Sequence, residues 1–558
     1  MSLRKQFSLL FRASPLFRTV LWIIAIVLFV TVTRIASYHA KKMPVLVSIN
    51  PQIGAPGDIM VITGNNFGNS RGSSFVEIGG SKLTSSCYLD WNDSEIKVII
   101  PSNVQDGLVF VSTNEKSNQL FFANENDIPS PVRPDPKKSI PIISALSKNA
   151  ASVGEVISIE GSNYGNSRGE SAVFFTANHE TNDVTQDNFI SASDLDFDYE
   201  LWSDTEIKVR IPDGAKTGSC YVKTDKGESN RISLSVPQNI GQKKYSNKHT
   251  FVVQLTQDIA NAVSTDENST ITLRVPRPAL FSSQPKIELS ECNPTPILEN
   301  FKNTIVHQIQ LSSAEHSRVK FSHNFIITVY SVSTEINARK VKPFSETERK
   351  LFKTYTVADK CIPSTDSEIV SIAKNVVGKE NNPYAKAKLL YNYLVENYKI
   401  LQNPRTENAE IKKMLESKSG DAYDFAILYT ALLRASGVPA IPMSGILVDT
   451  NSKSKNHWWT EFYIEGFGWI PVDAALGAGL HFLPFVAQSD AKAFYFGNLD
   501  SQHIAFSRGW NEIKSVTVNS STVYKPRFYA LQSIWEESTS SAVSYSSLWN
   551  NPSVLGIY

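Results

Sequence analysis

A histidine and an aspartate in the C-terminal third of the chain stand at a spacing that suits acid–base chemistry. His457 opens the run HWWTEFYI, and Asp473 ends the run GWIPVD. Alternating side chains place His457 and Trp459 on one face of a predicted strand and Trp458 on the other. A turn at 466–468 would fold the two runs into a hairpin and bring Asp473 beside His457. In that arrangement a carboxylate can orient an imidazole.

The nucleophile that such a pair could activate is expected at the start of a helix. The run DAYDFAILYTALLRASGVP has apolar residues at spacings of three and four, which predict a helix that ends at Gly437 and Pro439. Unpaired N–H groups and the helix dipole stabilise a thiolate at such a start. The residue there is Ala422, whose methyl group cannot attack a carbonyl. Asp421 before it is predicted to cap the helix.

Other groups are poor substitutes for the missing thiol. Tyr423 has a rigid ring and an ordinary pKa of about 10, and Ser419 precedes the helix. Cys361 lies far upstream, and nothing in the sequence places it near His457. The sequence therefore favours a domain without an activated nucleophile.

The aromatic side chains near His457 admit two interpretations. Trp458, Trp459 and Trp469 are either core residues or the wall of a cleft that stacks on a peptide or a sugar. A histidine beside a tryptophan-rich strand is often structural as well. The predicted neighbour Asp473 is what makes His457 a candidate site residue.

Length and composition exclude a small single domain and a nucleic-acid-binding protein. The chain has 558 residues, of which 41% are hydrophobic and 20% charged, enough for three or four separate cores. The formal net charge is +1, and no basic tract follows the N-terminus, so no surface suits nucleic acid. The 4 cysteines lack CxxC spacing, and neither a metal site nor a cofactor is predicted. A Cys292–Cys361 bridge is left open.

The N-terminus indicates a location outside the cytoplasm. Basic residues precede the uncharged run TVLWIIAIVLFVTVT, namely Arg4, Lys5, Arg12 and Arg18. This charge bias predicts that the short N-terminus stays cytoplasmic and that the apolar segment anchors the chain in the cell membrane as a single helix. The apolar run is short for a bilayer, but its flanking arginines can snorkel. The alternative is a signal peptide whose cleavage releases a secreted protein.

Two segments beyond the apolar run repeat each other. GNNFGNSRG at 64–72 returns as GSNYGNSRG at 161–169, and WNDSEIKVIIP at 91–101 returns as WSDTEIKVRIP at 202–212. Short β-branched runs between Gly, Pro and Asn predict two small β-sandwiches. The glycines are predicted to supply turns rather than a phosphate cradle, because no helix follows them.

The repeats resemble the IPT/TIG immunoglobulin-like family over about 44–122 and 140–236, with the turn Gly-x-Asn-Phe/Tyr-Gly as the most recognisable element. The resemblance implies modules that act as spacers or adhesion surfaces. Alternating apolar runs over 248–340 predict a further β-sandwich. The run NPYAKAKLLYNYLVENYKI then switches to helical spacing.

The domain that follows resembles the transglutaminase-like superfamily, which has a papain-type fold and a Cys-His-Asp triad. The resemblance covers roughly 382–480 and continues into the run FYFGNLDSQHIAFSRG. It implies that His457 and Asp473 occupy triad positions and that Ala422 replaces the cysteine of the family's Gly-Asp-Cys pattern. It also implies that the preceding region is the β-domain that accompanies many bacterial members.

The predicted fold is multidomain, with a membrane helix, two IPT/TIG-like β-sandwiches, a further β-sandwich and a C-terminal α+β domain of papain type. The predicted boundaries are 1–18 for the cytoplasmic N-terminus, 19–36 for the transmembrane anchor, 44–122 and 140–236 for the repeated sandwiches, 248–340 for the β-domain, 345–510 for the transglutaminase-like domain, and 511–558 for a packing segment.

The predicted function is ligand binding outside the cytoplasm. An inactive transglutaminase-like domain would bind a peptide, a protein or a cell-wall ligand, with Asp421 and the three tryptophans in the cleft. The alternative is an active peptidase or amidase that uses another nucleophile or an activated water. No cofactor, no metal and no nucleic-acid partner are predicted.

Overall fold

The computed structural model describes residues 14–40, 43–125, 140–180, 188–194, 196–264, 270–301, 303–310, 317–359, 361–405, 411–482, 489–509, 534–538 and 543–558. Most of the predicted N-terminal cytoplasmic segment and residues 511–533 of the predicted packing segment lie outside these ranges.

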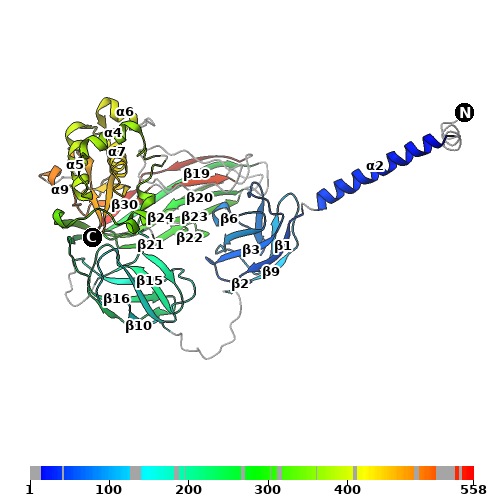
Figure 1. The fold of residues 1–558 in the computed structure, drawn as a ribbon, viewed down its shortest axis with the longest axis horizontal. Helices are drawn as coiled ribbons and strands as arrows, with labels where there is room; N and C mark the ends of the chain where they lie inside the picture. The colour runs from blue at the N-terminus through cyan, green and yellow to red at the C-terminus, as the bar shows by residue number, and fades with distance from the viewer. Residues whose placement is uncertain are drawn as a thin grey trace.

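A single helix, α2 (Pro15–Ala40), precedes the β-rich body and projects away from it (Figure 1). Its large apolar side chains are exposed, among them Trp22 and Phe29. Over the part of the chain that the structure covers, no helix is long and apolar enough to cross a membrane. The predicted anchor over 19–36 is therefore not confirmed.

The first repeat folds as two facing sheets, with strand orders β1-β3-β7-β6 and β2-β9-β8-β4-β5. The strands are β1 (Val45–Asn50), β2 (Ile53–Gly54), β3 (Ile59–Asn65), β4 (Phe75–Ile78), β5 (Ser81–Lys82), β6 (Tyr88–Trp91), β7 (Glu95–Ile99), β8 (Gly107–Ser112) and β9 (Leu120–Asn124). Inward residues such as Met60 and Ile62 fill the space between the sheets. The predicted β-sandwich is confirmed.

The second repeat has the matching sheet order β10-β11-β15-β14, which faces β13-β12-β16-β17 with β18 on β16. The strands are β10 (Ile142–Leu146), β11 (Val156–Ser162), β12 (Ala172–Ala177), β13 (Phe189–Ser191), β14 (Tyr199–Trp202), β15 (Glu206–Arg210), β16 (Ala215–Thr224), β17 (Gly227–Glu228) and β18 (Ile232–Leu234).

The repeated sequence motif makes the same contact in both modules. The indole of Trp91 donates to the Phe67 carbonyl at 3.1 Å, and that of Trp202 donates to the Tyr164 carbonyl at 3.2 Å. Gly68 and its counterpart Gly165 both have a φ of 87°, where glycine costs least. The motif is therefore a structural turn, as predicted.

The third β-sandwich is built from sheets β21-β24-β19-β32, with β33 on β19, and β22-β23-β20-β31. The strands are β19 (Gly241–Val263), β20 (Thr270–Pro276), β21 (Lys286–Asn293), β22 (Leu298–Phe301), β23 (Thr304–Gln310), β24 (Ser317–Ile336), β31 (Trp535–Ser538), β32 (Ser544–Trp549) and β33 (Ser553–Ile557). The last three come from 511–558, the predicted packing segment, and they complete this sandwich. Strands β32 and β33 pair with β19 on the side away from β24, and β31 pairs with β20.

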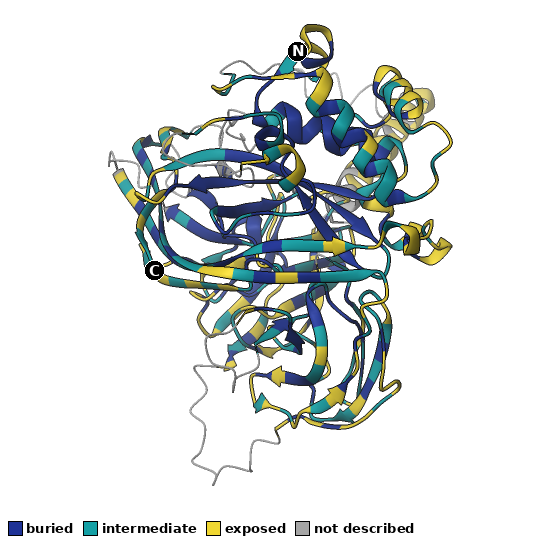
Figure 2. Ribbon diagram, turned by 90° about the vertical axis from the view of Figure 1, so that its left-hand side faces the viewer, coloured by how far each residue is buried: buried dark blue, intermediate teal, exposed yellow. Residues whose placement is uncertain are grey.

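The C-terminal α+β domain covers one face of the sheet β29-β28-β27-β30 with helices. Its elements are α3 (Glu346–Leu351), α4 (Ser367–Val377), α5 (Pro383–Asn397), β25 (Lys399–Ile400), α6 (Ile411–Ser417), β26 (Ser419–Gly420), α7 (Ala422–Ala435), β27 (Ala440–Val448), β28 (Ser454–Ile464), β29 (Gly468–Val472), α8 (Ala474–Gly477), α9 (Ala491–Phe494) and β30 (His503–Arg508). All of α7 except Tyr423 and Ala435 is buried, more than the one face that was predicted (Figure 2). Thus α7 is the central helix of the domain.

Buried charges lock the second module onto the α+β domain. Arg508 donates to Asp196 at 2.7 Å and to Glu461 at 3.0 Å, and the indole of Trp469 also donates to Asp196, at 2.7 Å. Lys243, on β19 of the third sandwich, pairs with Asp213 of the second module at 2.5 Å and donates to the Trp469 carbonyl of the α+β domain at 2.6 Å. Because these groups are desolvated and paired, the module is held in a fixed orientation.

The described cysteines are all free thiols, including Cys292 and Cys361. The bridge left open by the sequence does not form. Cys292 lies on β21 in the third sandwich, whereas Cys361 precedes α4 in the next domain.

Candidate functional site

The start of α7 is fixed by a reciprocal cap. Asp421 accepts from the Asp424 N–H at 3.0 Å, and Asp424 accepts from the Asp421 N–H at 3.1 Å. Arg405 adds a backbone N–H to Asp421 at 2.8 Å and an ion pair to Asp424 at 3.3 Å. Asp421 is therefore the predicted helix cap, and its carboxylate is occupied by structural hydrogen bonds.

Ala422 is the first residue of α7, and the residues that follow it contact β28, the strand that carries His457. The ring of Tyr423, the next residue, is 5.9 Å from that of Trp458, the neighbour of His457. The segment that ends at Arg405 touches both elements, because Lys455 Nζ on β28 donates to the Gln402 carbonyl at 2.9 Å. The seat at position 422 and the first half of β28 therefore converge.

The predicted hairpin of β28 and β29 is confirmed, and it brings His457 to Asp473. His457 Nε2 donates to Asp473 Oδ2 at 2.5 Å, and both side chains are buried. Asp473 Oδ1 accepts from the Leu476 N–H at 2.8 Å and so caps α8. The carboxylate thus holds the imidazole with one oxygen while the other fixes the chain that follows.

A second histidine, which the sequence did not single out, extends this pair. His503 Nε2 donates to Asp473 Oδ2 at 3.1 Å, and its Nδ1 donates to Asp500 Oδ1 at 2.8 Å. Tyr495 donates its hydroxyl to Asp500 at 2.9 Å. An imidazole that donates from both nitrogens to carboxylates carries a positive charge. In the sequence, the three-residue spacing of Asp500 and His503 at the start of an apolar strand could have indicated this pair.

The pKa values follow from burial and from these contacts. Burial lowers the pKa of His457 more than Asp473 raises it, so this ring is neutral. Burial also opposes charge on His503, but Asp500 and Asp473 outweigh it and raise the pKa to about 9. Burial raises the pKa of Asp473, yet His457 and His503 together hold it below its usual range. The site therefore contains a positive His503 between two carboxylates.

This charge predicts that stability depends on pH. The folded-state pKa of His503 lies above the unfolded value, so its contribution is complete below about pH 6.5 and is lost as the pH rises through 9. We expect the free energy of unfolding of wild type to exceed that of His503→Gln most at pH 6. The difference should shrink by about 3 kcal/mol towards pH 10. Tryptophan fluorescence in denaturant measures it, and a pH-independent difference would contradict the assignment.

The three tryptophans are buried and offer no exposed ring face. Trp459 lies between the two histidines, with ring centroids 6.1 Å from His457 and 5.2 Å from His503. Trp458 packs in the same core, and Trp469 lies against the second module. Their exposed fractions are 2%, 1% and 3% for Trp458, Trp459 and Trp469. Of the two interpretations, the core is the one that their burial favours, because the hairpin is covered on both faces.

Two clusters in the described part of the chain have donor atoms close enough to share a metal ion. One is His457, Asp473 and His503. Both nitrogens of His503 donate hydrogen bonds, and Asp473 Oδ2 accepts from both histidines. The atoms that would bind a metal are therefore already engaged in hydrogen bonds. This cluster fits a proton-bearing network better than a metal site. The second cluster lies in the third sandwich.

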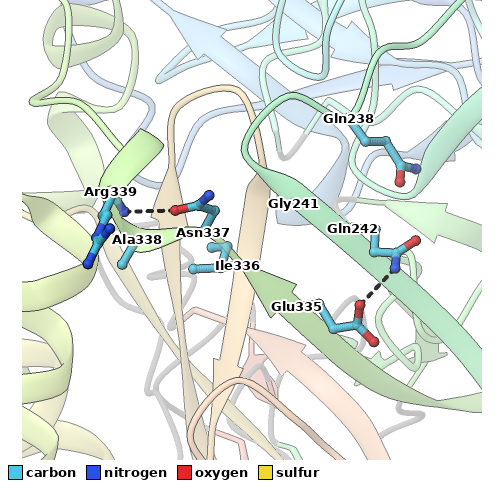
Figure 3. A pocket seen from close by; sticks show the side chains of 8 residues that line it. All are labelled: Gln238, Gly241, Gln242, Glu335, Ile336, Asn337, Ala338 and Arg339. Carbon is cyan, nitrogen blue, oxygen red and sulfur yellow. Dashed lines mark hydrogen bonds between the residues drawn. The ribbon is translucent and has the colours of Figure 1, made fainter.

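A pocket of about 810 Å³ opens where β19 begins and β24 ends. Gln242 and Glu335 line it and share a hydrogen bond of 2.7 Å, and Asn337 and Arg339 lie beside them (Figure 3). None of the candidate site residues lines this pocket. This pocket is therefore separate from the buried cluster of His457, Asp473 and His503.

Comparison with curated proteins finds partial matches. An uncharacterized protein of Haemophilus influenzae is 27% identical over 172 residues, which are 26% of this chain and 47% of that protein. A cyclomaltodextrin glucanotransferase of Paenibacillus macerans is 35% identical over 86 residues, 15% of this chain and 12% of the enzyme. The chain thus spans about half the length of the first relative and a small part of the second.

Two solved structures are similar over about half of the chain. A putative cysteine protease from Cytophaga hutchinsonii has a TM-score of 0.36 at 17% identity and covers 57% of this chain and 92% of that one. The periplasmic domain of TgpA from Pseudomonas aeruginosa has a TM-score of 0.24 at 12% identity, covering 54% and 86%. Because these TM-scores are low, the domains are assigned from the family models alone.

Two family models match the chain. One covers residues 370–474, from α4 to the start of α8, and includes positions 422, 457 and 473. The other covers residues 44–126, the first β-sandwich, whose strand order the second sandwich repeats. The chain therefore contains a domain of the transglutaminase-like superfamily and, N-terminal to it, an IPT/TIG domain.

Proposed function

We propose that this chain is an extracytoplasmic binding protein whose transglutaminase-like domain does not catalyse acyl transfer. The observation that carries the proposal is Ala422 at the start of α7, where the family's Gly-Asp-Cys pattern has its nucleophile. An alanine cannot form a thioester. Loss of a triad nucleophile costs on the order of a million-fold in kcat.

The groups that could replace a thiol are poorly placed for attack. Ser419 lies on β26, and its hydroxyl donates to Ser417 at 3.1 Å. Tyr423 packs its ring on Trp458. Cys361 forms no disulfide and precedes α4, whereas His457 lies on β28 and is hydrogen-bonded to Asp473. The buried network around His457 is therefore proposed to support the fold rather than a reaction.

The ligand of this protein is proposed to be a protein, a peptide, or a carbohydrate such as a cell-wall polymer. The two IPT/TIG-like modules would act as spacers or adhesion surfaces, and the buried charges of the second would set its orientation. One partial relative is a cyclomaltodextrin glucanotransferase, which makes a carbohydrate a ligand class to test. Attachment to the cell membrane through 19–36, with the bulk of the chain outside, stays a prediction.

Turnover by the purified protein tests the proposal. We expect no incorporation of a primary amine into a glutamine-containing peptide, no release of ammonia and no peptide cleavage above buffer. His457→Ala is the matched control, and it should give the same background signal as wild type in all three assays. Turnover that His457→Ala abolishes would overturn the proposal in favour of an active peptidase or amidase.

A further inference from the structure

The third sandwich contains three side chains with metal-binding atoms at the place where its two sheets face each other. Cys292 on β21 and His323 on β24 are paired directly across neighbouring strands of one sheet. His307 lies on β23 in the opposite sheet. These residues belong to three strands, and the fold alone brings them together.

Their donor atoms converge on one point. His307 Nε2 and His323 Nε2 are 2.8 Å apart, and Cys292 Sγ is 3.9 Å from His307 Nε2. All three donors lie within 4.8 Å of one another. Both histidines are buried, whereas Cys292 is half-buried and so gives the cluster a side open to solvent.

Packing alone does not account for two histidines at this position. The surrounding core is apolar, and the ring of Phe321 lies 4.8 Å from that of His307. Burying polar groups in such a core is costly unless they are paired. Here the two Nε2 atoms share one hydrogen bond, and His307 Nδ1 has no partner within the described residues. An apolar pair would fill the same space without this cost.

We propose that Cys292, His307 and His323 bind one transition-metal cation, with Zn²⁺ as the reference ion, through a thiolate and two imidazole Nε2 atoms. Tetrahedral Zn²⁺ at its usual bond lengths separates two nitrogens by about 3.3 Å and a nitrogen from a sulfur by about 3.6 Å. The His307–His323 and Cys292–His307 separations differ from these by about half an ångström or less, and Cys292 Sγ lies within 4.8 Å of the His323 donor nitrogen. The fourth position faces the half-buried side and is left to water.

The protonation states favour binding by the histidines. Burial lowers the pKa of His307 to about 3 and that of His323 to about 4, so both rings are neutral and can donate a lone pair. Burial also raises the pKa of the Cys292 thiol to about 11, so the metal has to displace the thiol proton. Metal binding releases one proton, from the Cys292 thiol, and leaves a thiolate on the ion. The sequence predicted no metal here because its cysteines have no CxxC spacing, and the ligands meet only through the pairing of β21 with β24 and the packing of the two sheets.

The metal would join the two sheets that support the transglutaminase-like domain. The core around His307 and His323 continues into Ile446 of β27 and Ile504 of β30. Binding to the folded state alone raises stability by mass action. We therefore expect Zn²⁺ to raise the melting temperature of the full chain.

Cobalt provides a direct spectroscopic test. Full-length protein without a histidine tag is stripped with a chelator and titrated with Co²⁺. We expect one equivalent to produce thiolate-to-cobalt charge transfer in the near ultraviolet, together with the strong visible bands of four-coordinate cobalt. One equivalent of Zn²⁺ should abolish both. Cu⁺, added as a second competitor, shows whether the site prefers the softer ion.

The controls separate this site from adventitious binding. Cys292→Ser should abolish the charge-transfer band, and His323→Gln should weaken binding at least tenfold. Cys361→Ser, which removes the other half-buried thiol, should leave the spectrum unchanged. A folded wild-type protein that gives no charge-transfer band overturns the proposal even if the variants fail to fold. A band that survives Cys292→Ser also overturns it.

Discussion

Asp473→Ala is expected to lower the free energy of unfolding of the transglutaminase-like domain by about 3–5 kcal/mol, because it leaves buried partners without their counter-charge. The lost carboxylate accepts from His457 at 2.5 Å and from His503 at 3.1 Å. A positive His503 would keep only Asp500. Denaturant unfolding followed by tryptophan fluorescence reports the change, since three buried tryptophans lie in this domain.

Two further variants divide this effect into its parts. Asp473→Asn keeps an oxygen for the Leu476 N–H but loses the charge, so it should restore only the cap, about 1 kcal/mol. Asp490→Ala removes a similar cap from α9, where the carboxylate accepts from the Ala493 N–H at 3.1 Å in an exposed setting. It should therefore cost about 1 kcal/mol. Equal losses in Asp473→Ala and Asp490→Ala would show that the histidine network contributes little.

The second large effect is expected from restoring a thiol with Ala422→Cys. The helix start stabilises a thiolate, and we expect His457, on the strand that α7 contacts, to accept the proton of the new thiol. A lower pKa increases the thiolate fraction and reduces intrinsic nucleophilicity, so the net gain is largest in mild acid. We expect alkylation by iodoacetamide at pH 6 about tenfold faster than for an ordinary cysteine.

The chain supplies internal references for this measurement. Cys361 and Cys292 are half-buried free thiols, so peptide mapping gives their rates in the same sample. A small reagent is needed because Ala422 is only 7% exposed. Adding His457→Ala to Ala422→Cys should remove the enhancement. A rate that does not depend on His457 would mean that the two positions are not coupled.

Much of the fold could be predicted from the sequence where the signals are local. The repeat predicted both sandwiches, because each turn motif is repeated with its own tryptophan contact. The hairpin of β28 and β29 and the start of α7 followed from alternation and from the Asp421 cap. The position of strands β31 to β33 in the third sandwich could not be predicted. Their pairing with β19 and β20 spans about half of the chain, and no local pattern encodes it.

The candidate site shows the same division. His457 and Asp473 belong to one hairpin, so their contact followed from the strand pattern. His503 reaches Asp473 from β30, which pairs with the far side of β27, and the sequence alone does not fix that register. The cluster of Cys292, His307 and His323 depends on two sheets facing each other. Such cross-sheet contacts require the fold before they can be seen.

We propose that Ala422 occupies the position of a nucleophilic thiol that has been lost. The most direct measurement is the pKa of the thiol introduced by Ala422→Cys, taken from the ultraviolet absorbance of the thiolate against pH, with wild type subtracted. This titration does not depend on reagent access. We expect the pKa of this thiol to lie well below the ordinary value of about 8.5, and to rise when His457→Ala is added. A pKa at or above 8.5 that is unchanged by His457→Ala would contradict it.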